Sequence, residues 1–268
     1  MTQYEAIGRR HSVRRFQMTA IDPHIMKQIN CFIQTLAPLH PQAAYRIAVV
    51  EAYNTQKHVF KGMFLVQAPY YLVLSAKDHP FAAVNAGYVM EQLVLYLVSK
   101  GFATCYLGDA KSKPDLDQYQ PMIVVAFGKA AATAVKKPAS RKKLTELVNQ
   151  PPVAQQNARK IIEAARIAPS AFNLQPWRFM PQDGKIHIFM KKESLMQTKR
   201  MKELTLLDMG IAMCHMALAA EELWLDWRLS REDTSKEPIW KGCQYVATLY
   251  YEIKSFLFCL FIKFSHRA

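Results

Sequence analysis

The sequence predicts an α+β fold that consists of two related α/β halves. Helix-like and strand-like segments alternate along the chain, and the second half repeats the order of the first. Two long apolar helices also match: NAGYVMEQLVL at 85–95 and DMGIAMCHMAL at 208–218 share a glycine, a methionine and a final leucine, each pair 123 positions apart. Because the order of the elements repeats as well, a duplication is favoured over chance similarity between two apolar helices.

The first half is expected to contain three helices and three strands. Asp22 followed by Pro23 is typical of a helix start, and Gly101 is typical of the residue that ends one. The strand segments are rich in aromatic and β-branched residues. The expected helices cover 1–10, 22–36 and 81–100, the strands cover 45–51, 70–76 and 122–128, and a basic loop covers 136–143.

The second half is expected to follow the same plan. Its helices cover 157–167 and 206–225, and its strands cover 177–181, 185–190 and 245–253. The polar, proline-bearing stretch NQPPVAQQ at 149–156 is typical of a linker, so the halves are placed at 1–149 and 150–252. A hydrophobic tail at 253–268 follows, and its role as a terminal strand or an interface segment stays open.

Composition limits the classes of function. The chain has 268 residues, of which 51% are hydrophobic and 21% charged, with a net charge of +14, so a partner that carries phosphate is plausible. A basic nucleic-acid-binding protein is a remote alternative, because the basic residues are not interleaved with aromatics in a known motif. The five cysteines have no metal-site or disulfide spacing, which predicts a cytoplasmic protein without a metal. The N-terminus lacks the pattern of a signal peptide, and no uninterrupted apolar run is long enough to cross a membrane.

The segment RRHSVRRF at 9–16 is a candidate anion site. In an extended chain, Arg10, Ser12 and Arg14 point to one side while Val13 points to the core. Guanidinium groups offer fork-shaped donors to phosphate oxygens. A phosphate site is favoured over a solvated basic turn, and the second basic cluster, SRKK at 140–143, could help to neutralise the same anion.

The segment AARIAPSAFNLQPWRF at 164–179 is a candidate ring-binding loop. Its helix must end before Pro169, because the residue before a proline is pushed out of the helical region. Ser170, Asn173 and Gln175 then project from irregular chain, and amide side chains suit the mixed donor and acceptor edge of a heteroaromatic ring. A purely structural turn is the alternative.

These segments together resemble the nitroreductase family of FMN-dependent oxidoreductases. RRHSVRRF is similar to its phosphate strip, APSAFNLQPWRF to its flavin-edge loop, GFATCYLGD at 101–109 to its glycine-rich loop, and SRKKLTELV to its C-terminal phosphate segment. Ordinary members are homodimers that hold each FMN between subunits. Here each main motif occurs once, in opposite halves, as in the tandem single-chain branch of the family. The resemblance therefore implies a nitroreductase-like fold, an intramolecular pseudo-dimer with one flavin site, and a monomer.

The resemblance also implies the site residues and the activity. FMN would be reduced by NAD(P)H and reoxidised by a nitroaromatic, a quinone or a similar small electrophile in a ping-pong reaction. No catalytic side chain is implied, and a non-catalytic flavin-storage or sensing protein remains an alternative. The implied flavin contacts are Arg10, His11, Ser12, Arg14 and Arg141 around the phosphate, the backbone of Leu107 and Gly108 near the ring, Pro169, Ser170 and Asn173 from the other half, and Lys61 as a polar contact.

Overall fold

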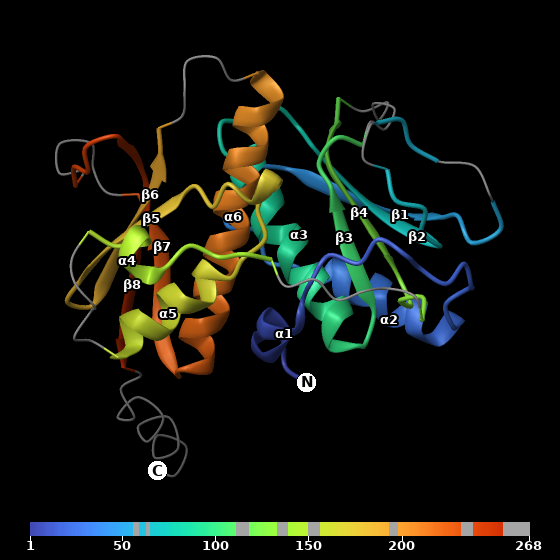
Figure 1. Cartoon of the computed structure of the whole chain (residues 1–268), viewed down its shortest axis with the longest axis horizontal. Helices are drawn as coiled ribbons and strands as arrows, with labels where there is room; N and C mark the ends of the chain where they lie inside the picture. The colour runs from blue at the N-terminus through green and yellow to red at the C-terminus, as the bar shows by residue number, and fades with distance from the viewer. Residues whose placement is uncertain are drawn as a thin grey trace, which may run out of the picture.

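A computed structural model describes residues 1–55, 59–62, 65–110, 118–132, 139–149, 156–192, 198–231 and 238–253. Two four-stranded antiparallel sheets lie on either side of a central pair of long helices, α3 and α6 (Figure 1). This arrangement confirms the α+β prediction, with two halves of like construction. The tail predicted at 253–268 lies outside the described residues except for Ile253, where the last strand ends.

The first half contains one sheet and three helices. The helices are α1 (Gln3–Arg9), α2 (Pro23–Gln34) and α3 (Ala82–Ser99), and the strands are β1 (Tyr45–Glu51), β2 (Tyr70–Ala76), β3 (Ala103–Leu107) and β4 (Gln120–Gly128), in the order β1-β2-β4-β3. As expected, Asp22 begins α2 by accepting a hydrogen bond from the His24 N–H. Strand β3 was expected to be a loop. It is a short edge strand of five residues, too brief for an alternating pattern to stand out.

The second half repeats this sheet. Its helices are α5 (Gln156–Arg166) and α6 (Lys199–Glu222), with a 3-10 turn at Ala171–Asn173, and its strands are β5 (Trp177–Gln182), β6 (Lys185–Lys191), β7 (Leu225–Ser230) and β8 (Cys243–Ile253), in the order β5-β6-β8-β7. The short helix α4 (Leu144–Leu147) comes before the predicted boundary at 149/150 but lies against the second sheet. Helix α6 begins at Lys199 and not at residue 206, because Thr198 caps it by accepting from the Met201 N–H and its first turns are polar. The short elements α4 and β7 were not predicted.

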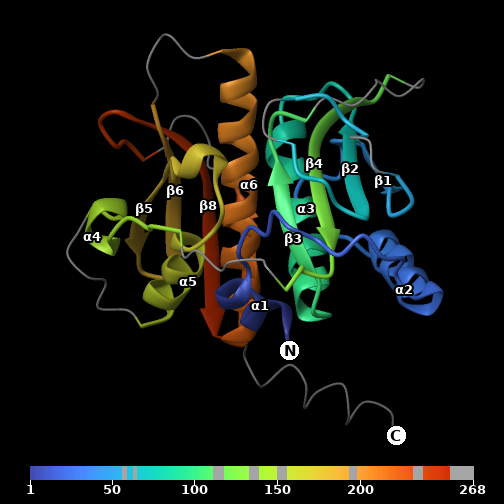
Figure 2. The same cartoon turned by 45° about the vertical axis from the view of Figure 1, so that its right-hand side comes forward.

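Helices α3 and α6 cross with their backbones in contact. A Cβ atom on Gly87 would lie 2.0 Å from the carbonyl oxygen of Leu207, and one on Gly210 would lie 1.9 Å from that of Val84. Gly87 and Gly210 are 123 positions apart, and so are Val84 and Leu207. The two contacts are therefore reciprocal, as a local two-fold axis between the helices requires. Figure 2 shows α3 and α6 side by side between the two sheets.

Helix α6 belongs to the core of the molecule. It is the one helix among the described residues that is long and apolar enough to cross a membrane, but 83% of its most apolar window is buried inside the structure. Segment 139–149 packs on the second sheet, since Val148 forms a parallel bridge with Phe179. The boundary between the halves at 149/150 stays a prediction.

Candidate functional site

The arginine strip runs along the edge of the first sheet. The Val13 N–H donates to the Thr104 carbonyl at 3.0 Å, and Ser12 forms a parallel bridge with Thr104 of β3. Val13 is buried and Arg14 is exposed, which is the alternation that an extended segment produces. The strip is thus held as an added edge strand whose polar side chains face away from the core.

The loop after α5 has unusual backbone geometry. Phe172, Asn173 and Gln175 all have positive φ, at 50°, 57° and 51°. Each such non-glycine residue costs on the order of 1 kcal/mol or more, and strain of this kind gathers at binding sites. Helix α5 ends at Arg166, ahead of Pro169, as the sequence predicted.

Hydrogen bonds within the loop and to two other segments, α6 and 139–149, hold the strained loop in place. Both carboxylate oxygens of Asp208 accept from the Ala171 N–H at 3.0 Å. The hydroxyl of Ser170 accepts from the Gln175 N–H at 3.0 Å, and the Gln175 side-chain oxygen accepts from the Lys142 N–H at 2.8 Å. Gln175 is therefore a buried structural tie within the loop.

A cavity of about 380 Å³ lies between the two halves beside this loop. Its volume falls in the range of small-molecule sites. The first half contributes the strip and the end of β3, and the second half contributes the loop and one side of α6. Six of the predicted contacts line it: Ser12, Arg14, Leu107, Gly108, Pro169 and Ser170.

Two further predicted residues, Arg10 and Arg141, are a half-buried cationic pair outside the cavity lining, and their charges interact. Nε and Nη1 of Arg10 and Nε of Arg141 are buried and have no hydrogen-bond partner among the described residues. Burial, followed by the charges of Arg10 and Arg166, lowers the pKa of Arg141 to about 10. Buried donors that lack an acceptor are rare in proteins, so the pair is suited to an anion.

The remaining predicted residues do not line the cavity. His11 is part of the strip, where its Nδ1 donates to the Arg9 carbonyl at 3.1 Å, and Lys61 is exposed. Asn173 accepts from Arg141 Nη1 at 3.1 Å and donates to the Ser140 carbonyl at 3.0 Å. In this position Asn173 orients Arg141, whereas the sequence placed it against a ring. Flavin contacts by these three residues stay predictions.

Sequence reasoning missed several residues of the cavity. Arg200 Nη2 donates to the carbonyls of Gly108 at 2.8 Å and Met122 at 2.9 Å, so it ties α6 to the end of β3. Phe172 is 66% exposed although it lines the cavity. Asp208 could have been found, because a buried acid on an otherwise apolar helix is unusual.

A buried polar network joins the halves behind the cavity. His215 Nδ1 donates to the Ala164 carbonyl at 2.9 Å, which leaves one shared proton between His215 Nε2 and Glu91 Oε1, 2.8 Å apart. The Tyr106 hydroxyl donates to Glu91 Oε2 at 2.6 Å. Burial, followed by the Glu91 charge, raises the pKa of Tyr106, so Tyr106 stays a neutral donor. His215 is a core histidine with both ring nitrogens engaged.

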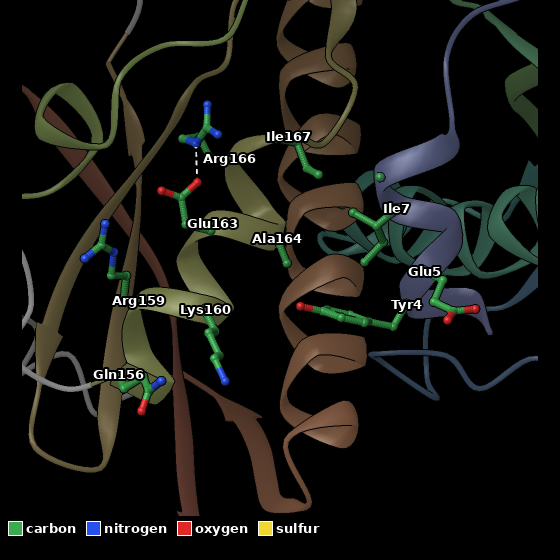
Figure 3. Close-up of a pocket in the computed structure, with 11 residues that line it drawn as sticks. Tyr4, Glu5, Ile7, Gln156, Arg159, Lys160, Glu163, Ala164, Arg166 and Ile167 are labelled. Carbon is green, nitrogen blue, oxygen red and sulfur yellow. Dashed lines mark hydrogen bonds and ion pairs between the residues drawn. The ribbon is translucent and has the colours of Figure 1, made fainter. Parts of the chain in front are cut away.

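A wider groove of about 610 Å³ lies between α1 and α5 (Figure 3). Tyr4 and Ile7 reach into it from α1, Lys160 from α5, and Ile167 from the residue that follows α5. None of the predicted cofactor contacts lines this groove, so size alone does not locate the site.

The chain was compared with known families and structures. A family model described as "Putative TM nitroreductase" matches residues 2–220. A nitroreductase structure from Thermotoga maritima is similar over 93% of this chain and 94% of its own, with 22% identity and a TM-score of 0.65, which supports the same fold. Comparison with curated proteins gave no match.

Two other nitroreductase structures match about half of the chain. One from Bacteroides fragilis with bound FMN has 15% identity, covers 53% of this chain and 95% of its own, and has a TM-score of 0.43. An FMN- and NADPH-dependent nitroreductase from a Sphingopyxis strain has 16% identity, covers 57% and 100%, and has a TM-score of 0.43. The family match includes the strip, the ring-binding loop and nearly all of α6. Because it extends over most of the sequence, the chain belongs to the TM nitroreductase family.

Proposed function

We propose that the chain is an FMN-dependent oxidoreductase that uses NAD(P)H to reduce small electrophilic aromatics such as nitroaromatics or quinones. The observation that carries the proposal is the pair Arg10 and Arg141. Three of their buried nitrogens, Nε and Nη1 of Arg10 and Nε of Arg141, lack an acceptor among the described residues. Arg10 belongs to the strip that lines the cavity through Ser12 and Arg14, and Arg141 contacts Asn173 in the loop on its other side.

The residues present fit the phosphate end of FMN. Arg10 and Arg141 would donate from their guanidinium groups, and Ser12 and Arg14 would add a hydroxyl and a third cation. A phosphate carries nearly two negative charges at neutral pH and accepts several charge-assisted hydrogen bonds. It would also offset the burial and the like-charge repulsion that together lower the pKa of Arg141.

The cavity fits the ring end. Pro169 and Ser170 would line one side, and the backbone of Leu107 and Gly108 the other, with the Gly108 carbonyl held by Arg200. When bound, FMN would supply the hydride and electron transfer, and the protein would supply position and electrostatics. Phe172 lines the cavity and is exposed to solvent, so this side of the cavity would be accessible to NAD(P)H and to the electron acceptor in turn.

The visible spectrum of the purified protein, before and after addition of FMN, tests the cofactor. We expect a bound-flavin spectrum, followed by oxidation of NADH or NADPH when a quinone or a nitroaromatic is added. A protein that binds FMN but shows no turnover would be a storage or sensing protein. A protein that stays colourless after FMN is added would contradict the proposal.

We also propose that the chain arose by tandem duplication and acts as a cytoplasmic monomer. The shared strand order and the 123-residue spacing support the duplication. Both motifs that flank the cavity come from this one chain, which supports a site that needs no second subunit. The halves at 1–149 and 150–252 follow from the same reasoning.

A further inference from the structure

A second cavity, of about 310 Å³, also lies between the two halves. Leu39 and His40, in the loop after α2, line one part of it. The start of α3, the end of β6, one side of α6, the end of β7 and the first residues of β8 line the rest. It shares no lining residue with the first cavity.

The two cavities are related by the internal two-fold axis. Residues of the first cavity have partners 123 positions away that line the second, as Gly87 and Gly210 do at the helix crossing. Three such pairs are Leu107 with Ser230, Ile123 with Val246, and Val84 of the second cavity with Leu207 of the first. The second cavity is therefore the counterpart of the proposed flavin cavity.

Each cavity has a wall formed by a loop whose backbone is hydrogen-bonded to the long helix of the same half. In the second, the His40 N–H donates to Asn85 Oδ1 at 3.1 Å. In the first, the Ala171 N–H donates to Asp208. Asn85 and Asp208 are again 123 positions apart, so the same helix position fixes the loop backbone in each half.

The polar donors of the first cavity are not repeated. Leu39 stands next to the anchored backbone amide where the first cavity has Ser170, and the arginine strip occurs once in the sequence. Arg231 is the one cationic residue among the described residues that line the second cavity, and its other walls are mainly apolar. The single guanidinium of Arg231 does not reproduce the proposed phosphate end, which consists of Ser12 and three arginines: Arg10, Arg14 and Arg141.

Aromatic surface takes the place of those donors. The His40 ring stacks on Phe81 with centroids 4.2 Å apart and an interplanar angle of 15°. Burial, followed by the charge of His79, lowers the pKa of His40, so its ring is neutral at pH 7. Flat apolar walls with a few polar groups are typical of sites for aromatic ligands.

We propose that the second cavity binds a flat, uncharged aromatic molecule of up to three fused rings that carries no phosphate. This inference does not depend on the proposed redox activity, because the walls of the second cavity come from other residues. The duplicated site would have lost its phosphate end and kept its ring end.

Lumichrome, a flavin-like ring system without ribityl or phosphate, is a suitable probe. The protein is first saturated with FMN to fill the first cavity and is then titrated with lumichrome by fluorescence anisotropy. We expect one further saturable equivalent. No binding to the FMN-saturated protein would overturn the proposal.

Variants locate the probe. Ala247 lines the second cavity, so Ala247→Leu should fill it and weaken lumichrome at least tenfold, whereas Ala247→Ser should bind as the original does. Leu39→Trp should block the same cavity from the loop after α2, and it replaces Ala247→Leu as the blocking variant if Ala247→Leu does not fold. FMN stoichiometry and the melting temperature report folding. Unchanged lumichrome binding in a folded blocking variant would place the probe elsewhere and overturn the proposal.

The two proposals can fail separately. If the protein does not bind FMN, the proposed function is wrong, and lumichrome titration of the flavin-free protein still tests the second cavity. In that case loss of one equivalent in Ala247→Leu, with Ala247→Ser unchanged, supports the inference. Equal binding by both variants contradicts it.

Discussion

At the scale of single residues, burial separates the arginines of the strip. Arg10 is half-buried, and two of its nitrogens are buried without a partner among the described residues, whereas Arg14 and Arg15 are exposed. A buried donor gains more from an anion than an exposed one, because the exposed group already has water. Arg10 is therefore expected to dominate phosphate binding.

Replacing Arg10 by Ala should weaken FMN by about 1.5–3 kcal/mol, the usual range for a hydrogen bond to a charged group. Riboflavin, which lacks the phosphate, should bind with little change. Arg15→Ala is the matched control, since Arg15 is exposed and is not a lining residue. Calorimetric titration of both ligands provides the measurement. An equal loss for FMN and riboflavin would show that Arg10 is structural.

Asn173→Ala distinguishes a ring contact from a contact that orients Arg141. Because Asn173 Oδ1 accepts from Arg141, the variant should weaken FMN by about 1 kcal/mol and leave riboflavin nearly unchanged. The same titrations measure both affinities. If riboflavin weakens as much as FMN, Asn173 contacts the ring, as the sequence alone suggested.

At the scale of elements, the contact between α3 and α6 determines how the halves fit. Gly210→Ala would place a methyl group into the backbone of Val84, so we expect a loss of stability of about 3 kcal/mol or more. Gly8→Ala in α1 is the control. A Cβ there meets nothing within 4 Å, and the change should stabilise by about 0.5–1 kcal/mol. Urea unfolding measures both, and similar behaviour of the two variants would contradict the close crossing.

The network of Glu91, His215 and Tyr106 is the second link between elements of the two halves. His215→Leu would leave Glu91 Oε1 and the Ala164 carbonyl without their partner, and we expect a cost of about 3–5 kcal/mol. Glu91→Gln should cost less, because an amide can still accept from Tyr106 and donate to His215 Nε2. Urea unfolding of the two variants gives the ranking. A larger loss in Glu91→Gln would mean that the carboxylate charge itself is required.

At the scale of the whole molecule, the motifs for phosphate and ring meet only because the halves pack together. One complete set exists, so FMN should titrate to one equivalent per chain. If FMN binds the folded chain and not the unfolded one, a concentration of about a hundred times its dissociation constant should stabilise the folded state by about 2.7 kcal/mol. Titration followed by thermal unfolding tests both statements. Two FMN equivalents would mean that the second cavity also accepts a phosphate.

Local sequence patterns predicted the helices, strands and turns that depend on residues close together in the chain. These patterns predicted the long helices, the buried strands, the end of α5 before Pro169 and the extended strip. They succeed because hydrophobic periodicity, the effect of proline and the alternation of side chains all act over a few residues. The duplication stays an inference from the repeated order of elements and from three residues shared at a spacing of 123 positions. Short edge strands such as β3 and the polar first turns of α6 give too weak a pattern.

Contacts between residues that are far apart in the sequence became known from the folded structure. The charges of Arg10 and Arg141 interact, and Asn173 accepts a hydrogen bond from Arg141. Arg200 donates to the Gly108 carbonyl in the other half. A second cavity lies at the position that the two-fold axis relates to the first. None of these contacts is encoded in a local pattern. They follow from the crossing of α3 and α6, where Gly87 and Gly210 let the two backbones touch and so place the described loops of one half against those of the other.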